Sequence, residues 1–205
     1  MAKQARAVAT RGQILDGAAR VFGRLGFERA RLNDIVDETG VTRGALYFHF
    51  QSKDELARIV IDEQHARSRA LIDRVTATDA DAITTIVELT REFARLAADD
   101  PVIRAGIGLI LEFNRGEQPI PAYLDWIEAS RRLVTRAIAE GDVRPEVVPA
   151  DAAEFIIGSF VGVQLSSQIV AGGVDLLDRV DRLIGFILPA LMRPERFAAH
   201  PATVG

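Results

Sequence analysis

Apolar residues recur at helical spacing on both sides of a single glycine in DIVDETGVTRGALYFHF, residues 34–50. Gly40 can take the left-handed conformation that ends a first helix, and Thr42 can then accept the free N–H groups that begin a second. If Leu46 and Phe50 point inward, both helices share one small core. The pattern predicts a helix, a tight turn and a second helix.

The opposite face of this second helix would carry hydrogen-bond donors and small residues, and no acid. Its members are Thr42, Arg43, Gly44, Ala45, Tyr47 and His49. Such a face suits the major groove of DNA, because an arginine reaches guanine edges, a threonine at the helix start meets phosphate, and small residues approach thymine methyl groups. A helical hairpin inside an all-α core would have the same spacing, so geometry alone leaves both interpretations open.

The segment before this motif predicts one more helix. A capping box that begins at Thr10 would open it, and Gly26 would end it. We expect residues 1–9 to form a mobile basic arm. Two basic residues in this segment, Arg6 and Arg11, are candidates for contact with backbone phosphates.

A second capping box, formed by Ser52 and Glu55, opens a long helix over residues 53–74. Lys53 in its first turn is a further candidate phosphate contact. At 1.5 Å per residue the helix is roughly 33 Å long, so it can join DNA contacts to a second domain. Gln64 is the polar residue of this helix best placed to contact a ligand, and a solvated position is the alternative interpretation.

Amphipathic and apolar patterns predict the remaining helices at 79–99, 102–113, 121–140, 150–171 and 175–192. Gly106 and Gly108 each cost about 1 kcal/mol inside a helix, so something requires the space they leave. We expect a loop at 114–121, a kink or early end near Pro189 and frayed residues over 193–205. The last two helices are too apolar to face water, which favours a dimer by four-helix packing over a plain core.

Composition and charge narrow the classes of protein. The net charge is −4, but residues 1–53 carry nine Lys and Arg against five acids, or +4, and the remainder −8. This asymmetry places the phosphate-attracting end at the N-terminus. There is no cysteine, signal peptide or apolar run of membrane-spanning length, so we expect a cytoplasmic protein that binds no membrane. No catalytic, cofactor or metal-ligand pattern occurs, so neither an enzyme nor a metal site is predicted.

Residues from about 10 to 62 resemble the DNA-binding domain of the TetR family of bacterial repressors. The matching positions are Ile35, Gly40, Val41, Thr42, Gly44, Leu46, Tyr47, His49, Phe50, Lys53 and Leu56. The resemblance implies an all-α fold of about nine helices, with a three-helix helix-turn-helix DNA-binding domain at 1–51 and a larger helical ligand-binding and dimerisation domain at 52–205. It also implies a homodimer on a palindromic operator of double-stranded DNA, and nucleoid association when DNA is bound.

One position departs from the TetR pattern. The family usually has Ser or Thr just before the helix that opens with Leu32, whereas this chain has Ala30 and Arg31. Asn33 is the alternative cap that the sequence offers.

The wider sequence is similar to the γ-butyrolactone receptor group of TetR repressors. The similarity rests on KQARAVATR near the start, GVTRGALYFHF, PVIRAG at 101–106 and the helix that contains Trp126. In that group a tryptophan at this place covers a buried pocket for a small neutral lactone, and ligand releases the protein from its operator.

The candidate ligand-binding residues are apolar with a few hydrogen-bonding groups. They are Gln64, Phe93, Leu109, Phe113, Trp126, Phe155, Ser159 and Val163. None is charged, which favours a neutral ligand over an anion. Two other interpretations stay open, a repressor that senses drugs or antibiotic intermediates and a helical protein–protein adaptor.

Overall fold

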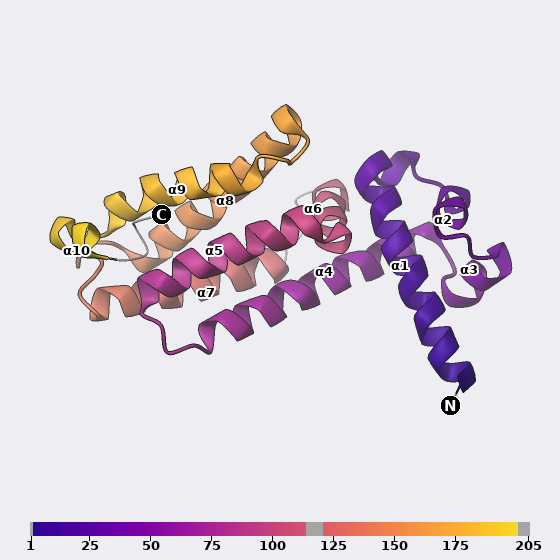
Figure 1. Ribbon diagram of the computed structural model, residues 1–205, viewed down its shortest axis with the longest axis horizontal. Coiled ribbons are helices and arrows are strands. Elements are labelled where there is room, and N and C mark those ends of the chain that lie inside the picture. Colours follow the sequence, from indigo (N-terminus) through magenta and orange to yellow (C-terminus); the bar gives the residue numbers. More distant parts are fainter. Residues whose placement is uncertain (1, 114–120, 201–205) are drawn as a thin grey trace. The chain divides into compact units, whose positions relative to one another are not determined.

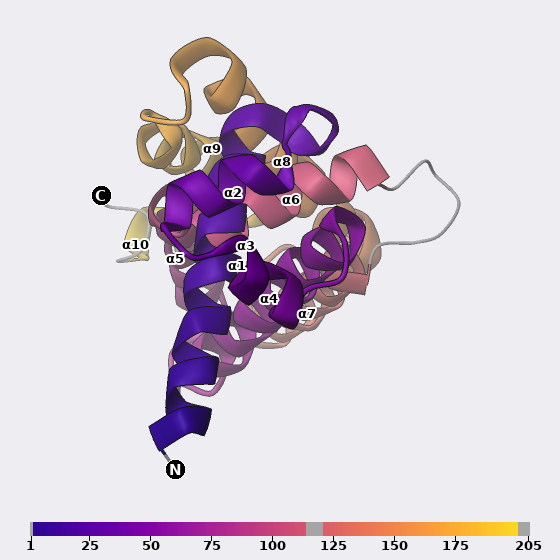
Figure 2. The same ribbon diagram turned by 90° about the vertical axis from the view of Figure 1, so that its right-hand side faces the viewer.

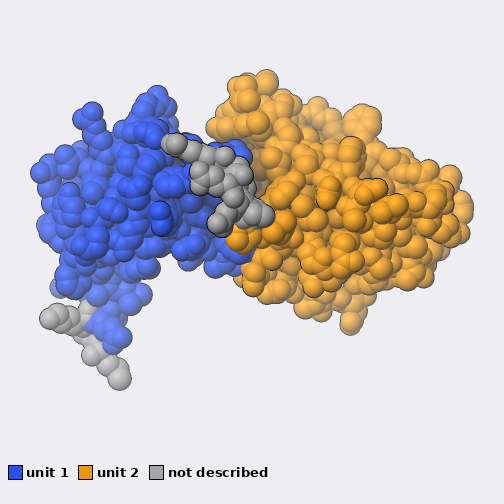
Figure 3. All heavy atoms as spheres, turned by 180° about the vertical axis from the view of Figure 1, so that it is seen from behind, with its two compact units in different colours: residues 1–68, 99–120 blue, residues 69–98, 121–205 orange. Residues whose placement is uncertain are grey.

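The computed structural model describes residues 2–113 and 121–200, and ten helices lie within them. The chain divides into two compact units (Figure 3). The first comprises residues 1–68 and 99–120, and the second 69–98 and 121–205. The all-α fold is therefore confirmed. The predicted functional boundary at residue 52 stays a prediction, since the first compact unit also includes a later helix.

The first unit contains three helices from the N-terminal part of the chain, the first part of a fourth, and a helix from the middle of the chain. They are α1 (Ala2–Arg29), α2 (Leu32–Thr39), α3 (Arg43–His49), α4 (Lys53–Thr76) up to residue 68, and α6 (Pro101–Phe113). In Figure 2, α2 and α3 lie in front of α1, whose N-terminal end extends beyond them.

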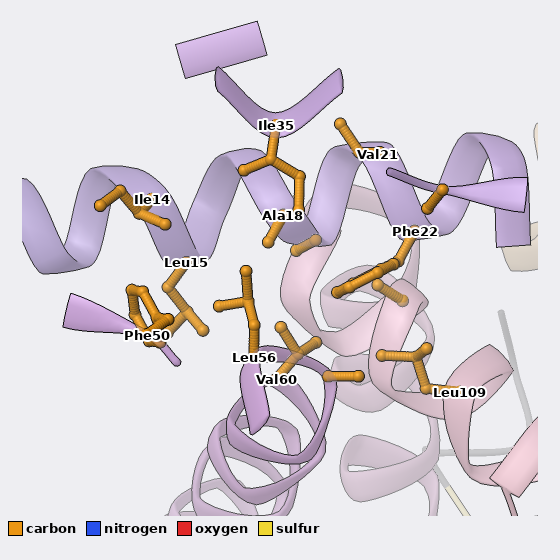
Figure 4. Close-up of a cluster of buried hydrophobic side chains, with 14 of the residues drawn as sticks. Ile14, Leu15, Ala18, Val21, Phe22, Ile35, Phe50, Leu56, Val60 and Leu109 are labelled. Atoms are coloured by element: carbon orange, nitrogen blue, oxygen red, sulfur yellow. The ribbon is translucent and has the colours of Figure 1, made fainter. Parts of the chain in front are cut away.

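Apolar side chains from all these helices, and from the residue that follows α3, meet in one core (Figure 4). Helix α1 contributes Ile14, Ala18 and Val21, and α4 contributes Leu56 and Val60, all fully buried. Because α6 adds side chains to the same cluster, a segment about fifty residues later in the chain than α2 and α3 becomes part of the unit that holds them.

The second unit is a bundle of five helices with the end of α4. The helices are α5 (Ala82–Asp99), α7 (Pro121–Ala139), α8 (Pro149–Ala171), α9 (Leu176–Leu191) and α10 (Pro194–Ala199). Figure 1 shows α8 running beside both α7 and α9, and α8 contacts each of them. Their ends lie within a few residues of the predicted boundaries.

The start of α1 differs from the sequence-based expectation. The helix begins at Ala2, so residues 2–9 are helical, and the predicted capping box at Thr10 lies inside the helix. The Gln13 side chain instead donates to the Thr39 carbonyl oxygen at 2.8 Å. The predicted interruption at Gly26 is present, since its φ of 72° breaks the helical backbone there.

The start of α2 settles which residue caps it. Arg31 has extended backbone angles, and its N–H donates to the Asp34 carboxylate at 2.8 Å. This pairing replaces the missing Ser or Thr, and Asn33 lies within the helix. A capping box has two hydrogen bonds, and Asp34 makes the one in which the third helical residue accepts the backbone N–H of the cap. This bond does not need a hydroxyl at the cap position.

One expectation for the C-terminal part was wrong. Residues 194–199 form α10, where frayed chain was predicted. Helix α9 ends at Leu191, two residues past Pro189 and one residue before the predicted end at 192. The predicted loop at 114–121 lies outside the described residues except for Pro121, which begins α7.

Helix α8 corrects the expectation that no segment reaches membrane-spanning length. Its 23 residues are long and apolar enough to cross a membrane by length and composition alone, and it is the one such helix among the described residues. A single helix of this kind is weak evidence for a membrane protein, because core helices of soluble proteins meet the same criterion. Much of its apolar surface is exposed, as described below.

Candidate DNA-binding surface and aromatic cluster

The turn between α2 and α3 has the predicted chemistry. Gly40 adopts a φ of 68°, and its N–H donates to the Val36 carbonyl oxygen at 2.8 Å. The hydroxyl of Thr42 accepts the Ala45 N–H at 3.1 Å and so caps α3. A left-handed glycine followed two residues later by a threonine cap reverses the chain between two helices. The turn prediction is confirmed.

Helix α3 separates buried from exposed residues largely as its spacing predicts. Leu46 and Phe50 are fully buried, whereas Thr42, Arg43 and Gly44 are exposed. Of the other face residues, Tyr47 is 53% exposed and Ala45 and His49 are half-buried. The helix therefore displays one arginine, one tyrosine and a glycine to solvent from a rigid core.

Sequence reasoning missed Phe48, which is 77% exposed. On a helix with 100° per residue, Phe48 lies opposite the buried Leu46 and Phe50 and near the middle of the exposed face. Projecting each residue of α3 onto a helical wheel would have found it. The exposed face is therefore more aromatic than predicted.

The two basic candidates on α1 are solvent-exposed. Arg6 lies on the part of the helix that was predicted to be a mobile arm. The Arg11 guanidinium carbon lies 5.5 Å from the centre of the Phe50 ring. Because Phe50 directly follows α3, this cation–π contact holds Arg11 beside the end of the candidate recognition helix.

Lys53 has a structural role that the sequence did not indicate. Its ammonium donates to the carbonyl oxygens of Phe27 and Ala30 at 2.8 and 3.0 Å. It also lies 4.1 Å from the centre of the Phe27 ring. Lys53 thereby ties the start of α4 to the end of α1, and a contact with phosphate stays a prediction.

Ion pairing reduces the free positive charge of the first unit. The Glu38 carboxylate binds Arg20 at 2.7 Å and Arg24 at 3.2 Å. The hydrogen bond from Arg20, with that from Arg24, lowers the pKa of Glu38 below its usual value. Two of the nine N-terminal cations are thus neutralised on the side of α1 that contacts α2, and the exposed cations of α1 and α3 keep the charge that can attract phosphate.

Three of the predicted ligand residues belong to the first unit. Leu109 is 2% exposed and packs in the core of that unit. Phe113 packs edge-on against Phe27, with ring centres 4.6 Å apart. Gln64 is buried, and its Nε2 donates to Ser68 at 2.9 Å, whereas its Oε1 has no partner among the described residues. Of these three, only Gln64 has a free polar atom for a ligand.

The second unit contains an aromatic cluster around the single tryptophan. The Trp126 ring lies 4.5 Å from that of Phe93, which lies 5.4 Å from Phe160. All three side chains are more than nine-tenths buried. The Trp126 Nε1–H is buried without a hydrogen-bond partner among the described residues. Buried indole N–H groups usually have a partner, so this donor is available to an oxygen atom of a bound molecule.

The predicted ligand-lining stripe of α8 is wrong at its first member. Phe155 is 63% exposed, and Phe160 points into the aromatic cluster instead. Ser159 and Val163 are half-buried. Because α8 is apolar almost all round, its sequence pattern has no strong direction, and packing against α5 and α7 decides which face is inward.

One group of acidic and histidine side chains has the proximity of metal ligands. Ligand atoms of Asp81, Asp142 and His200 lie within 4.8 Å of one another. Each has a protein partner: Asp81 bonds His200 at 3.0 Å, and Asp142 bonds Arg196 at 2.6 Å. These contacts attach α10 to the rest of the second unit, and they account for the group without a metal ion.

A helix-turn-helix on a rigid core, joined to a second helical unit with a buried aromatic cluster, defines the class of bacterial transcriptional regulators. The chain belongs to the TetR family. Residues 14–60 match the model for bacterial regulatory proteins of the tetR family, and residues 80–192 match the model for the tetracyclin repressor-like C-terminal domain.

Curated relatives include a receptor protein and a regulator that matches only the DNA-binding part. The A-factor receptor protein of Streptomyces griseus is 36% identical over 196 residues, which cover 95% of this chain and 68% of that protein. The HTH-type transcriptional regulator TtgR of Pseudomonas putida is 46% identical over 56 residues, which cover 27% of each chain.

Solved structures of similar chains have the same fold throughout. CprB of S. coelicolor A3(2), a TetR family protein, superposes with a TM-score of 0.84 at 28% identity, over 95% of this chain and 94% of that one. A γ-butyrolactone receptor described as ArpA-like has a TM-score of 0.80 at 28% identity, over 97% and 94%. CprB in complex with its operator sequence also has a TM-score of 0.80 at 28% identity, over 97% and 94%.

Proposed function

We propose that this chain is a ligand-responsive transcriptional repressor that binds a palindromic operator as a homodimer and is released by a small neutral molecule of γ-butyrolactone type. The exposed face of α3 carries this proposal, because Arg43, Gly44 and Tyr47 face solvent on a helix whose other side is anchored in the core. A regulator of this kind acts in the cytoplasm, associates with the nucleoid when bound, and catalyses no reaction.

DNA recognition by α3 follows from the size of the helix and the chemistry of its face. Arg43 can donate two hydrogen bonds to a guanine edge, and the capped start of α3 can meet a phosphate. Gly44 lets the backbone approach the groove, and Arg6 and Arg11 add phosphate contacts. The relative that was solved with its operator sequence shares this fold over nearly the whole chain, which supports the assignment.

A homodimer explains an otherwise unpartnered apolar stripe on α8. Phe155, Gly158, Gly162, Leu165 and Ile169 are all exposed and are spaced alternately three and four residues apart. This is the spacing of a helix that packs along another helix, and its two glycines let a second backbone come close. On α9, Phe186 is 79% exposed. Two copies related by a twofold axis would place two α3 helices on half-sites about 34 Å apart.

The dimer proposal has a matched pair of variants. Leu165 on the stripe and Leu111 on α6 are similarly exposed, at 50% and 58%. We expect Leu165→Glu to shift sedimentation from dimer to monomer, because two buried carboxylates would face each other across the axis, and Leu111→Glu to leave the dimer intact. A dimer that survives Leu165→Glu unchanged contradicts the assignment of this stripe.

The aromatic cluster of the second unit is the proposed ligand site. Phe93 and Phe160 offer apolar surface to an alkyl chain, and the unpartnered Trp126 N–H can donate to the carbonyl oxygen of a lactone. Two similar proteins are described as an A-factor receptor and a γ-butyrolactone receptor, which agrees with this ligand class. Gln64, whose Oε1 also lacks a partner among the described residues, belongs to the first unit and stays a separate prediction.

Within the first unit, α6 provides a route by which a change of conformation can reach the DNA-binding helices. The Glu112 carboxylate accepts the Phe27 N–H at 2.9 Å, and Phe113 packs edge-on against the Phe27 ring. The Phe27 carbonyl in turn binds Lys53 at the start of α4. We infer that ligand shifts the population toward a conformer in which these contacts are rearranged and two α3 helices no longer fit successive grooves.

One set of measurements tests the regulator. In fluorescence anisotropy with an operator selected from random duplex DNA, Arg43→Ala should weaken binding by at least about tenfold, because one guanine contact per half-site is lost. Arg132→Ala, which removes an exposed arginine from α7, should have no effect. Equal binding by both variants and the unchanged protein would contradict recognition by α3.

The ligand is tested with a synthetic γ-butyrolactone that carries an alkyl side chain. Trp126 is the single tryptophan, so its emission reports this site alone. Titration should change the emission and release the operator, and Trp126→Phe should bind operator but release it only at higher lactone concentration. An operator complex that is stable at saturating lactone, with unchanged emission, would remove the lactone assignment and leave a repressor for another ligand.

A further inference from the structure

The Phe48 ring has no role in the packing of its own helix. It is 77% exposed, whereas Leu46 and Phe50, on either side of it in the sequence, are fully buried. An exposed phenylalanine by itself needs no explanation. Here the residue lies near the centre of the face that is proposed to enter the major groove, beside Tyr47 and one turn after Gly44.

The orientation of this ring is supported by contacts that reach the core. Phe48 packs edge-on against His49, with ring centres 5.0 Å apart and an angle of 83° between the planes. His49 in turn lies 6.3 Å from the ring of the buried Phe50. The aromatic series from Phe48 to Phe50 therefore restricts the motion of the exposed ring, so that less side-chain freedom is lost when a partner binds.

Open space surrounds Gly44, one turn before Phe48. A methyl group added at Gly44 would meet only the Thr42 hydroxyl oxygen, at 4.0 Å. The fold therefore does not require a glycine there, although a glycine in a helix is unfavourable relative to alanine. Gly44 lies one turn before Phe48 and adds no side chain to the exposed face of α3, so the ring of Phe48 is the apolar group that this part of the face presents.

The chemistry of phenylalanine restricts what this surface can contact in DNA. The ring has no group that donates or accepts a hydrogen bond, so it cannot bind a phosphate or a polar base edge in the way that Arg43 and Tyr47 can. In the major groove the apolar group on a base edge is the C5-methyl group of thymine. Cytosine and uracil present a hydrogen atom at that position.

We propose that Phe48 is a specificity-determining residue that contacts the C5-methyl group of a thymine in each operator half-site. This inference rests on the proposed function, because it requires α3 to enter the major groove. The protein would then require thymine at one position of each half-site, and this requirement would come from the methyl contact of Phe48 and not from hydrogen bonds to the base.

The experiment replaces thymine by deoxyuridine, which removes the methyl group and leaves base pairing and hydrogen-bonding groups unchanged. A palindromic duplex selected by the protein from a random pool serves as the operator, and symmetric thymine positions are replaced one pair at a time. Fluorescence anisotropy measures the affinity of the unchanged protein, Phe48→Ala and the control Tyr47→Phe.

We expect one pair of replacements to weaken binding by the unchanged protein about fifteenfold, or about fourfold for each half-site, from the loss of one buried methyl contact per site. Phe48→Ala should bind the thymine and deoxyuridine duplexes equally, whereas Tyr47→Phe should retain the preference for thymine. Because Phe48 is exposed, its variant should keep the helical content and urea midpoint of the unchanged protein.

Two outcomes would overturn the inference. In the first, no position distinguishes thymine from deoxyuridine. In the second, a position does so by the same factor in Phe48→Ala as in the unchanged protein. Failure of the proposed function is a different result, in which the selection yields no preferred duplex and all variants bind DNA equally weakly. A protein that selects an operator and still shows no methyl effect disproves only the role of Phe48.

Discussion

Alanine should have opposite effects on stability at the two glycines of α6, Gly106 and Gly108, when each is replaced separately. An ideal Cβ atom built on Gly106 would lie 2.4 Å from Cβ and 2.6 Å from Cγ of Gln64, whereas one built on Gly108 would meet nothing within 4 Å. Gly106 is buried and Gly108 exposed on the same helix. The expectation that both glycines leave required space therefore holds for Gly106 and is wrong for Gly108.

The difference between the two variants isolates the cost of overpacking. Each replacement gains about 1 kcal/mol of helix propensity, so this contribution cancels in the comparison. Overpacking a closely packed site costs about 1–3 kcal/mol. The contact at Gly106 involves the Gln64 Cβ, which cannot move without the α4 backbone, so we expect the upper part of this range. Gly108→Ala should then be more stable than the unchanged protein, and Gly106→Ala about 2–3 kcal/mol less stable than Gly108→Ala.

Urea unfolding followed by circular dichroism measures this difference, at one protomer concentration because a dimer's stability depends on it. The double variant Gly106→Ala with Gln64→Ala retains the Gln64 Cβ and should recover little stability. The reasoning is refuted if Gly106→Ala and Gly108→Ala have the same midpoint, because the close approach of α4 and α6 would then not constrain the fold.

Three further changes test individual contacts. Lys53→Met should lower stability by about 1–3 kcal/mol, since two carbonyl oxygens lose a charged donor, whereas Arg58→Met, at an exposed position on α4, should be nearly neutral in the same urea titration. The pKa of Glu38 lies below its usual 4.5 because two arginines of α1 bond to it. The Glu38 carboxylate therefore stabilises the fold above pH 4.5, and this stabilisation is lost as the pH falls through its lowered pKa. The urea midpoint of Glu38→Gln should then fall less steeply in acid than that of the unchanged protein. Equal slopes of midpoint against pH would contradict this contribution. In the Leu165→Glu background, which is expected to be monomeric, Phe160→Ala should cost about 3–5 kcal/mol and shift tryptophan emission, whereas Phe155→Ala should cost under about 1 kcal/mol. Similar losses for both would contradict the placement of α8.

Local chemistry made the DNA-binding part predictable. Gly40 can take a positive φ without strain, and Thr42 can cap the next helix, so seventeen residues carry their own turn geometry. The alternation of Leu46 and Phe50 with exposed residues then assigns the inner face of α3. These choices depend on contacts within a few residues, which is why the sequence pattern and the structure agree there.

The start of α1 was predicted less well, because the sequence offers two signals that only long-range contacts separate. Thr10 and Gln13 have the spacing of a helix start, yet Gln13 bonds Thr39, twenty-six residues away. The helix therefore continues back to Ala2. A spacing rule cannot distinguish a side chain that caps its own helix from one that bonds another helix.

Residue order and side-chain chemistry alone were sufficient to define the all-α class, the helix-turn-helix and the direction of the charge asymmetry. Packing between distant segments determined that Lys53 binds the end of α1, that α6 belongs to the core around it, and that Phe160 takes the place expected for Phe155. The physical reason is that a turn or a cap is stabilised by neighbours in the chain. A helix that is apolar on every side has no inward face until another helix packs against it.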